Sequence, residues 1–229
     1  MKYIFIDFEM NPMEHSYKEE REICWMEIIE FGAVMLDEDY KEISHFKEYV
    51  RPVYSNRVTA NITSLTGISM EQLSGKDHFE DVFRRFVSWC LSYGMDVEVY
   101  AWSESDLKQL TKEMKLKQVA LDEDAEYILA HWNDFQKEYD TLVKADSQFS
   151  LERALNSVGI SFAGKIHDAL FDARNTAELF TVTRDEEEFF KLYHYVKKNT
   201  SKGPKKTSTY AMGEIIDFGA LAEWLADDE

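Results

Sequence analysis

A histidine and an aspartate five residues apart could act together as a proton acceptor and a carboxylate ligand. They lie in the segment KIHDALFDARNTAELF, residues 165–180. His167 comes just before the first turn of a predicted helix and Asp172 one turn inside it, so a proton acceptor and a carboxylate can share one cleft. A helix cap and a surface residue would give the same local pattern. The predicted helix has an apolar face with three- and four-residue spacing: Leu170, Ala173, Ala177 and Phe180.

Two more acids follow the first apolar run of the chain. Residues 2–6, KYIFI, are typical of a strand and lead directly into Asp7-Phe8-Glu9. Because alternate side chains of a strand point to opposite faces, Asp7 and Glu9 share one face and Phe8 lies on the other. Neighbouring carboxylates repel each other, and a bound cation is the usual remedy. The pattern therefore predicts a cation site at this strand end.

A further acid lies near the middle of the sequence. Residues 97–102, VEVYAW, favour a strand, and residues 103–110 open a helix. Asp106 falls at this strand-to-helix junction, where open α/β sheets commonly build their sites. Glu104 is the competing acid.

Together these residues resemble the DEDDh class of ribonuclease-H-like 3′-to-5′ exonucleases. Asp7 and Glu9 match its first motif, Asp106 its second, and His167 with Asp172 its third, in the pattern His-x-Ala-x-x-Asp-Ala. The resemblance covers most of the chain, from about Lys2 to Phe180. The nearest branch is the one containing the histone-mRNA and RNA-interference-modulating exonucleases.

Three other segments support the resemblance. Residues 29–34, IEFGAV, resemble the second strand of that family, and residues 150–155, SLERAL, the segment before its third motif. Residues 65–68, LTGI, resemble its loop around the terminal nucleotide. The implied fold is α/β: a ribonuclease-H-like mixed five-stranded sheet flanked by helices.

The resemblance also implies roles for the polar residues. Asp7, Glu9, Asp106 and Asp172 would hold two divalent ions, Mg²⁺ or Mn²⁺, about 4 Å apart. Asp7 would bridge both ions, Glu9 and Asp172 would complete the first, and Asp106 would reach the second directly or through water. His167 would take a proton from the attacking water. Oxygen ligands suit such hard cations better than zinc.

Residues beside these motifs are expected to contact substrate. The resemblance implies that the terminal base and sugar would pack against Leu65, Gly67 and Ile68. An ordinary helix-capping loop would have the same composition. Trp102 either stacks on the penultimate base or fills the core at a strand end. The expected substrate-binding set is Phe8, Met10, Leu65, Thr66, Gly67, Ile68, Trp102 and Ser103.

The expected activity is metal-dependent hydrolysis at the 3′ end of single-stranded RNA or DNA, or of short oligonucleotides, releasing nucleoside 5′-monophosphates. Two alternatives stay open. One is a catalytically weak nucleic-acid-binding or assembly module on the same fold. The other is an enzyme restricted to dinucleotides and very short oligomers.

The charge of the chain bears on these alternatives. Lys and Arg number 26 against 44 Asp and Glu, a net charge of −18. Affinity for long nucleic acid depends on many basic contacts to phosphates. The composition therefore favours short or single-stranded substrates.

Length and composition set the remaining expectations. The 229 residues, 45% of them hydrophobic, suit one substantial domain over residues 1–198. No apolar run is long enough to span a bilayer, and the N-terminal residues lack the pattern of a signal peptide. We therefore expect no membrane contact and a cytoplasmic location. Cys24 and Cys90 make neither a metal pattern nor a disulfide framework and are expected in the core.

The outer segments differ in character. Residues 11–22 are polar and of mixed charge, which favours a loop. Residues 199–229 combine a basic linker around Gly203-Pro204 with a hydrophobic and acidic C-terminal tail. Such a tail is expected to dock on its own domain or on a protein partner.

Overall fold

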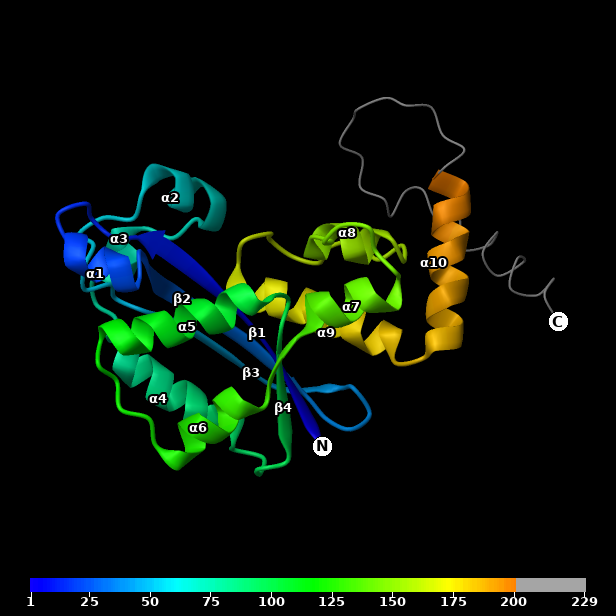
Figure 1. Cartoon of the computed structure of the whole chain (residues 1–229), viewed down its shortest axis with the longest axis horizontal. Helices are drawn as coiled ribbons and strands as arrows, with labels where there is room; N and C mark the ends of the chain where they lie inside the picture. The colour runs from blue at the N-terminus through cyan, green and yellow to red at the C-terminus, as the bar shows by residue number, and fades with distance from the viewer. Residues whose placement is uncertain (201–229) are drawn as a thin grey trace.

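The computed structural model describes residues 1–200. The tail expected over residues 201–229 therefore lies outside the described part. A sheet of five strands forms the centre of the molecule, in the order β3-β2-β1-β4-β5 (Figure 1). The strands are β1 Lys2–Pro12, β2 Met26–Leu36, β3 Glu42–Tyr49, β4 Val97–Ala101 and β5 Trp132–Asp134.

Strand pairing makes the sheet mixed. β1, β2 and β3 pair antiparallel, whereas β4 runs parallel to β1 and β5 parallel to β4. The last β1–β4 pair is Ile6 with Ala101, so the carboxyl ends of both strands emerge at one edge of the sheet. The predicted mixed five-stranded α/β fold is confirmed.

Helices cover both faces of the sheet (Figure 1). Three helices are short: α1 Lys18–Ile23 lies between β1 and β2, and α2 Ala60–Thr66 and α3 Met70–Leu73 follow β3. The others are α4 Phe79–Cys90, α5 Glu104–Leu116, α6 Glu123–Ala130, α7 Phe135–Leu142, α8 Leu151–Asn156, α9 Ala169–Thr183 and α10 Glu186–Thr200.

Successive side chains of β1 point to opposite faces of the sheet and enter two separate core clusters. Ile4, Ile6 and Phe8 join the cluster that contains residues of α4, α5 and α6. Phe5 joins the cluster that contains residues of α7, α8, α9 and α10. Because side chains two residues apart share a face, Asp7 lies on the α9 side of the sheet.

Several local predictions are confirmed. The predicted apolar face of α9 is buried, with Leu170 and Ala177 less than 10% exposed and Ala173 and Phe180 fully covered. Cys24 and Cys90 are both buried free thiols. Among the described residues, no helix combines the length and the apolar character that crossing a membrane would require.

The loop predicted for residues 11–22 is wrong in part. β1 extends to Pro12 through pairing with Met26, and α1 begins at Lys18. Helix α1 buries none of its residues, so it has no apolar face to give a periodic signal.

Candidate active site

The C-terminal half of β1 supplies two acids. Asp7 is partly buried and Glu9 is 9% exposed, and both follow Phe5 on the α9 side of the strand. Across the sheet Asp7 pairs with Gly32 and Glu9 pairs with Glu30 of β2. The strand thus presents two carboxylates in the layer between the sheet and α9.

Gly32 allows α9 to approach these acids closely. A Cβ atom at Gly32 would lie 2.1 Å from both the carbonyl carbon of Ala169 and the backbone nitrogen of Leu170. The first turn of α9 therefore lies against bare β2 backbone, beside the strand position of Asp7. This contact brings Asp172 to the acids of β1.

The loop before α9 places His167 over the same acids. Glu9, His167 and Asp172 each offer one possible metal-ligand atom, and these three atoms lie within 4.8 Å of one another. His167 has a φ of 63°, a left-handed conformation in which His is enriched among non-glycine residues, and its backbone N–H donates to Asp172 Oδ2 at 3.1 Å. The predicted pairing of His167 with Asp172 in one site is thus seen in the geometry.

Asp106 reaches the site from the start of α5. It is 6% exposed, and the backbone N–H of Phe8 donates a hydrogen bond to it. Glu104, the competing acid, is exposed and pairs with Lys108. The structure therefore places Asp106, and not Glu104, with the acids of β1.

The acids perturb one another strongly. Burial, followed by the charges of Asp106 and Asp172, raises the pKa of Asp7 well above its ordinary value. Burial, then the charges of Asp172 and Glu30, raises the pKa of Glu9 to about 8. Burial raises the pKa of Asp106 and of Asp172 to about 7, against the hydrogen bonds from the N–H groups of Phe8 and His167. Such a cluster is unfavourable when fully ionised unless a cation compensates it.

The donor set fits a hard divalent cation. Four carboxylates converge with a single imidazole, and both cysteines lie in the core outside the cluster. Carboxylate oxygens are the preferred ligands of Mg²⁺ and Mn²⁺, whereas zinc favours sulfur or several imidazoles. Asp7, Glu9, Asp106 and Asp172 are the residues that could hold such ions.

A second polar group, absent from the sequence-based set, lies behind the site. Lys47 Nζ on β3 lies 2.6 Å from Asp168 Oδ2 and 3.2 Å from Glu30 Oε1. The backbone N–H of Ala169 donates to Glu30 Oε2 at 3.2 Å, and the Asp168 side chain accepts from Phe171 N. These contacts fasten the start of α9 to β2 and β3. No local spacing predicts the Lys47–Asp168 and Glu30–Ala169 contacts, because these partners lie 121 and 139 residues apart in the sequence.

The expected substrate loop lies near the site. Leu65 is 41% exposed, whereas Ile68 is 2% exposed and packs with Ile29 and Leu73. Gly67 follows the last residue of α2 and has a φ of 75°. The Thr66 hydroxyl forms hydrogen bonds inside the loop, because it donates to Ile62 O and accepts from Ile68 N. Of these four residues, Leu65 and Gly67 offer accessible surface.

Of the other members of the expected substrate set, Phe8 is buried and Met10, Trp102 and Ser103 are partly buried. Phe8 is 5% exposed and packs against Phe31 with ring centroids 4.6 Å apart, so its ring does not face the acids. Trp102 packs against Phe135 at 5.8 Å, which is the core alternative, and its indole N–H is buried without a hydrogen-bond partner among the described residues. Ser103 caps α5, and Met10 is partly buried against the core.

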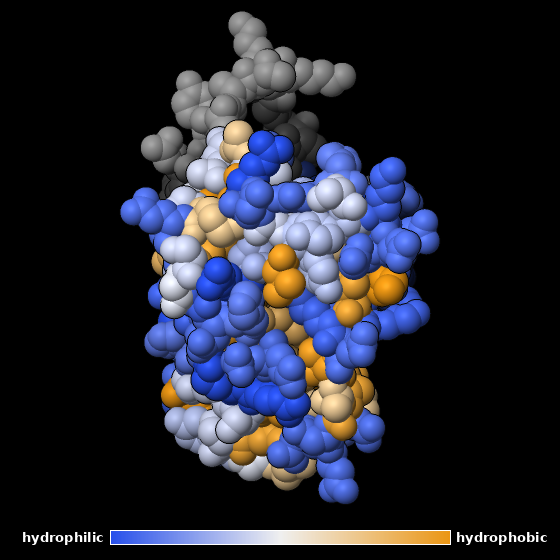
Figure 2. All heavy atoms as spheres, turned by 90° about the vertical axis from the view of Figure 1, so that its left-hand side faces the viewer, coloured by the Kyte–Doolittle hydropathy of each residue, from blue (hydrophilic) through white to orange (hydrophobic). Residues whose placement is uncertain are grey.

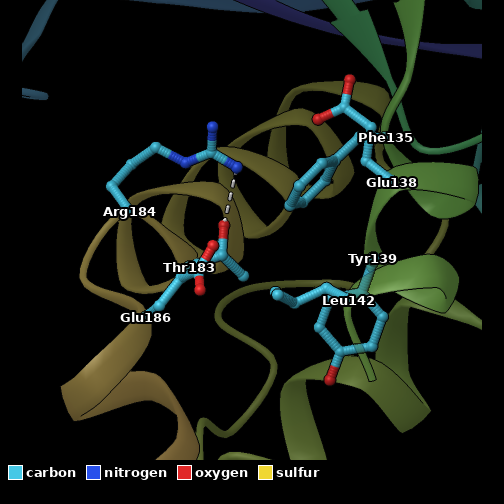
Figure 3. A pocket seen from close by; sticks show the side chains of 7 residues that line it. All are labelled: Phe135, Glu138, Tyr139, Leu142, Thr183, Arg184 and Glu186. Carbon is cyan, nitrogen blue, oxygen red and sulfur yellow. Dashed lines mark hydrogen bonds between the residues drawn. The ribbon is translucent and has the colours of Figure 1, made fainter. Parts of the chain in front are cut away.

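Two cavities lie apart from the acids. One of about 240 Å³ between α7 and the end of α9 contains Glu138 and Arg184, whose guanidinium donates to Thr183 Oγ1 (Figure 3). Another of about 630 Å³, beside α1 and the loop that precedes α2, is lined by Trp25 and Arg57 among others. The face that carries α1 to α3 is mainly hydrophilic, with hydrophobic atoms in separate patches (Figure 2).

Sequence comparison finds exoribonucleases among the relatives of this chain. ERI1 exoribonuclease 2 of Danio rerio is 32% identical over 196 residues, covering 77% of this chain and 34% of the relative. The 3′-5′ exoribonuclease 1 of Rattus norvegicus is 28% identical over 188 residues, covering 76% and 50%. The chain thus spans one third to one half of the length of these relatives.

Solved structures give the same result. The nuclease domain of 3′hExo, a DEDDh family member bound to rAMP, superposes with a TM-score of 0.69 and 25% identity, covering 81% of this chain and 92% of that one. Pop2p of S. pombe, in a form with bound Mg²⁺ and Mn²⁺, shares the fold at a TM-score of 0.58 and 16% identity, covering 82% and 84%.

The model of the Exonuclease (RNase_T) family matches residues 4–180, which contain all five polar residues of the site. The chain therefore belongs to the Exonuclease family, as the resemblance of its sequence to the DEDDh enzymes predicts.

Proposed function

We propose that this chain is a metal-dependent 3′-to-5′ exonuclease that releases nucleoside 5′-monophosphates from single-stranded RNA or DNA. The observation that carries the proposal is the convergence of Asp7, Glu9, Asp106 and Asp172 beside His167. The binding of rAMP by the 3′hExo nuclease domain supports a nucleoside 5′-monophosphate as product.

Each residue has a distinct task in this proposal. Asp7, Glu9, Asp106 and Asp172 would hold the divalent ions through their carboxylate oxygens. Bound Mg²⁺ or Mn²⁺ supplies charge stabilisation and makes water a better nucleophile. His167 accepts the proton of the attacking water. The hydrogen bond from its backbone N–H to Asp172 holds the residue beside the acids. The proton must leave through the open side, where His167 is exposed.

The net charge of −18 favours short substrates within this activity. Few arginines and lysines are available to neutralise a long phosphate backbone, so affinity should gain little beyond the first nucleotides. We therefore propose short oligonucleotides and single-stranded 3′ ends as the substrate class.

The test is degradation of a 5′-labelled single strand with Mn²⁺ or Mg²⁺, with and without chelator. We expect a ladder shortening from the 3′ end and nucleoside 5′-monophosphates in the supernatant. Strands of two to twenty nucleotides, in RNA and DNA forms, define the length preference. An Asp7→Asn variant should be inactive, and activity of that variant equal to the parent would contradict the proposed site.

A further inference from the structure

An exposed lysine connects the loop that carries His167 with the expected substrate loop. Lys165 lies two residues before His167, and its Nζ donates to the carbonyl oxygen of Thr66 at 2.8 Å. The same Nζ lies 2.6 Å from where a Cβ of Gly67 would be. The side chain thus connects the loop before α9 with the C-terminal end of α2, 99 residues away in the sequence.

The backbone that carries Lys165 is held firmly on both sides. Asn175 of α9 exchanges two hydrogen bonds with the backbone of Ala163, at 2.8 and 2.9 Å. Gly164 has a φ of 84°, and a Cβ there would lie 2.2 Å from the ring of Phe171. On the other side, the N–H of His167 is bound to Asp172. The direction in which Lys165 projects is therefore fixed by the same helix that carries Asp172.

The charge of Lys165 is not neutralised by a neighbour. Among residues 1–200 it forms no ion pair with a carboxylate, and its partner is the neutral carbonyl of Thr66. Lys47, the other lysine near the site, is already paired with Glu30 and Asp168 behind α9. Within the described part of the chain, Lys165 thus carries a positive charge without a carboxylate partner, two residues from His167 of the acidic site.

We propose that Lys165 binds a phosphate oxygen of the oligonucleotide next to its terminal nucleotide, releasing Thr66 as the strand enters. An ammonium group binds an anionic phosphate oxygen more strongly than a neutral carbonyl, because the hydrogen bond is charge-assisted on both sides. The long, flexible stem of lysine allows the exchange without movement of the fixed backbone. This inference rests on the proposed exonuclease function and adds a substrate-binding group to it.

The test compares Lys165→Met and Lys165→Arg with Lys112→Met. Lys112 is an exposed lysine on α5 without an ion pair among the described residues, so it controls for loss of one surface charge. Binding of a fluorescent single strand is measured with Ca²⁺ at several salt concentrations, and kcat and KM are measured with Mn²⁺. We expect Lys165→Met to raise Kd and KM about tenfold and to reduce the slope of log affinity against log salt by about 0.7. Lys165→Arg should retain the slope.

The outcomes separate this inference from the proposed function. If the parent protein degrades the strand but Lys165→Met matches Lys112→Met in Kd and salt slope, Lys165 does not bind phosphate. Weaker binding with an unchanged slope would mean that Lys165 only ties the loop to α2, which also overturns the inference. If the parent protein binds the strand but never shortens it, the exonuclease function fails, while the salt slope still decides the role of Lys165.

Discussion

The Nζ atom of Lys47 lies 2.6 Å from Oδ2 of Asp168. Lys47 is on β3, and Asp168 is the N-cap residue of α9. The ion pair thus ties the start of the helix that carries Asp172 to the sheet that carries Asp7. Glu30, 1% exposed, lies 3.2 Å from the same ammonium group and would otherwise be a buried charge without a counterion.

Replacing Lys47 should therefore reduce both the free energy of unfolding and the nuclease activity. In Lys47→Met the Glu30 and Asp168 carboxylates repel each other in a poorly solvated space. We expect a loss of about 2 to 3 kcal/mol in the free energy of unfolding, near the lower range for breaking a buried pair. Urea denaturation measures the change. The control is Lys41→Met, because Lys41 lies on the surface and pairs only at 3.9 Å with Asp39.

Enlarging Gly32 should displace α9. The added methyl group in Gly32→Ala would overlap the backbone of Ala169 and Leu170, and neither can rotate away as a flexible side chain could. We expect a destabilisation of about 3 kcal/mol or more and a large loss of nuclease activity, since Asp172 moves away from Asp7. Thermal unfolding and the strand-degradation assay measure both effects.

Gly75→Ala is the matched control for that substitution. A Cβ at Gly75 meets nothing within 4 Å, so its stability and activity should equal those of the parent protein. Equal behaviour of the two alanine variants would contradict the close approach of α9 to β2.

The pKa values predict an unusual dependence of stability on pH without metal. Burial raises the pKa of Glu9 to about 8 and of Asp172 to about 7, above the values near 4 that carboxylates have in an unfolded chain. The folded state then binds more protons than the unfolded state between about pH 4 and 8. The stability that these protonated groups contribute is fully present below about pH 4, falls progressively above it, and is lost once the pH has risen through the folded pKa values of about 7 and 8.

Divalent metal should reverse this trend. The ion replaces the protons, so its apparent affinity should rise between pH 6 and 8 as the carboxylates ionise. Thermal unfolding from pH 5 to 8.5, in chelator and in Mn²⁺, measures both effects. We expect Tm in chelator to fall across this range and the Tm increase given by Mn²⁺ to grow. A Tm in chelator that rises toward pH 8 would contradict the clustering of the acids.

The sequence contains the chemistry of the site but not its supports. Asp7, Glu9, Asp106, His167 and Asp172 could be identified because each lies at a recognisable strand or helix boundary within a family pattern. The roles of Gly32, Lys47 and Lys165 could not be identified, because they depend on partners about 100 residues or more away. Those contacts form only when β2, β3 and α2 pack against α9 and the loop before it.

The sequence also does not predict which face of a strand becomes covered by helices. Strand alternation places Phe8 opposite Asp7, but only the position of α4 and α6 makes that face a closed core. Trp102 likewise follows a strand that could end at the site, yet α7 covers it with Phe135 and Tyr139. Which face is covered depends on the helices that pack on it, and no local pattern records that.

His167 could have either of two roles in the site. Its ring lies within reach of the ligand atoms of Glu9 and Asp172, so it could bind metal or act as a base. Because four carboxylates already supply oxygen ligands, we expect the base role. In His167→Ala, kcat should fall at least about a hundredfold, as general-base catalysis typically contributes, while calorimetric titration with Mn²⁺ should give nearly the parent affinity. Asp172→Asn is the contrasting variant and should lose both. If His167→Ala loses Mn²⁺ affinity to the same degree as Asp172→Asn, the imidazole is a metal ligand and the base must be sought elsewhere.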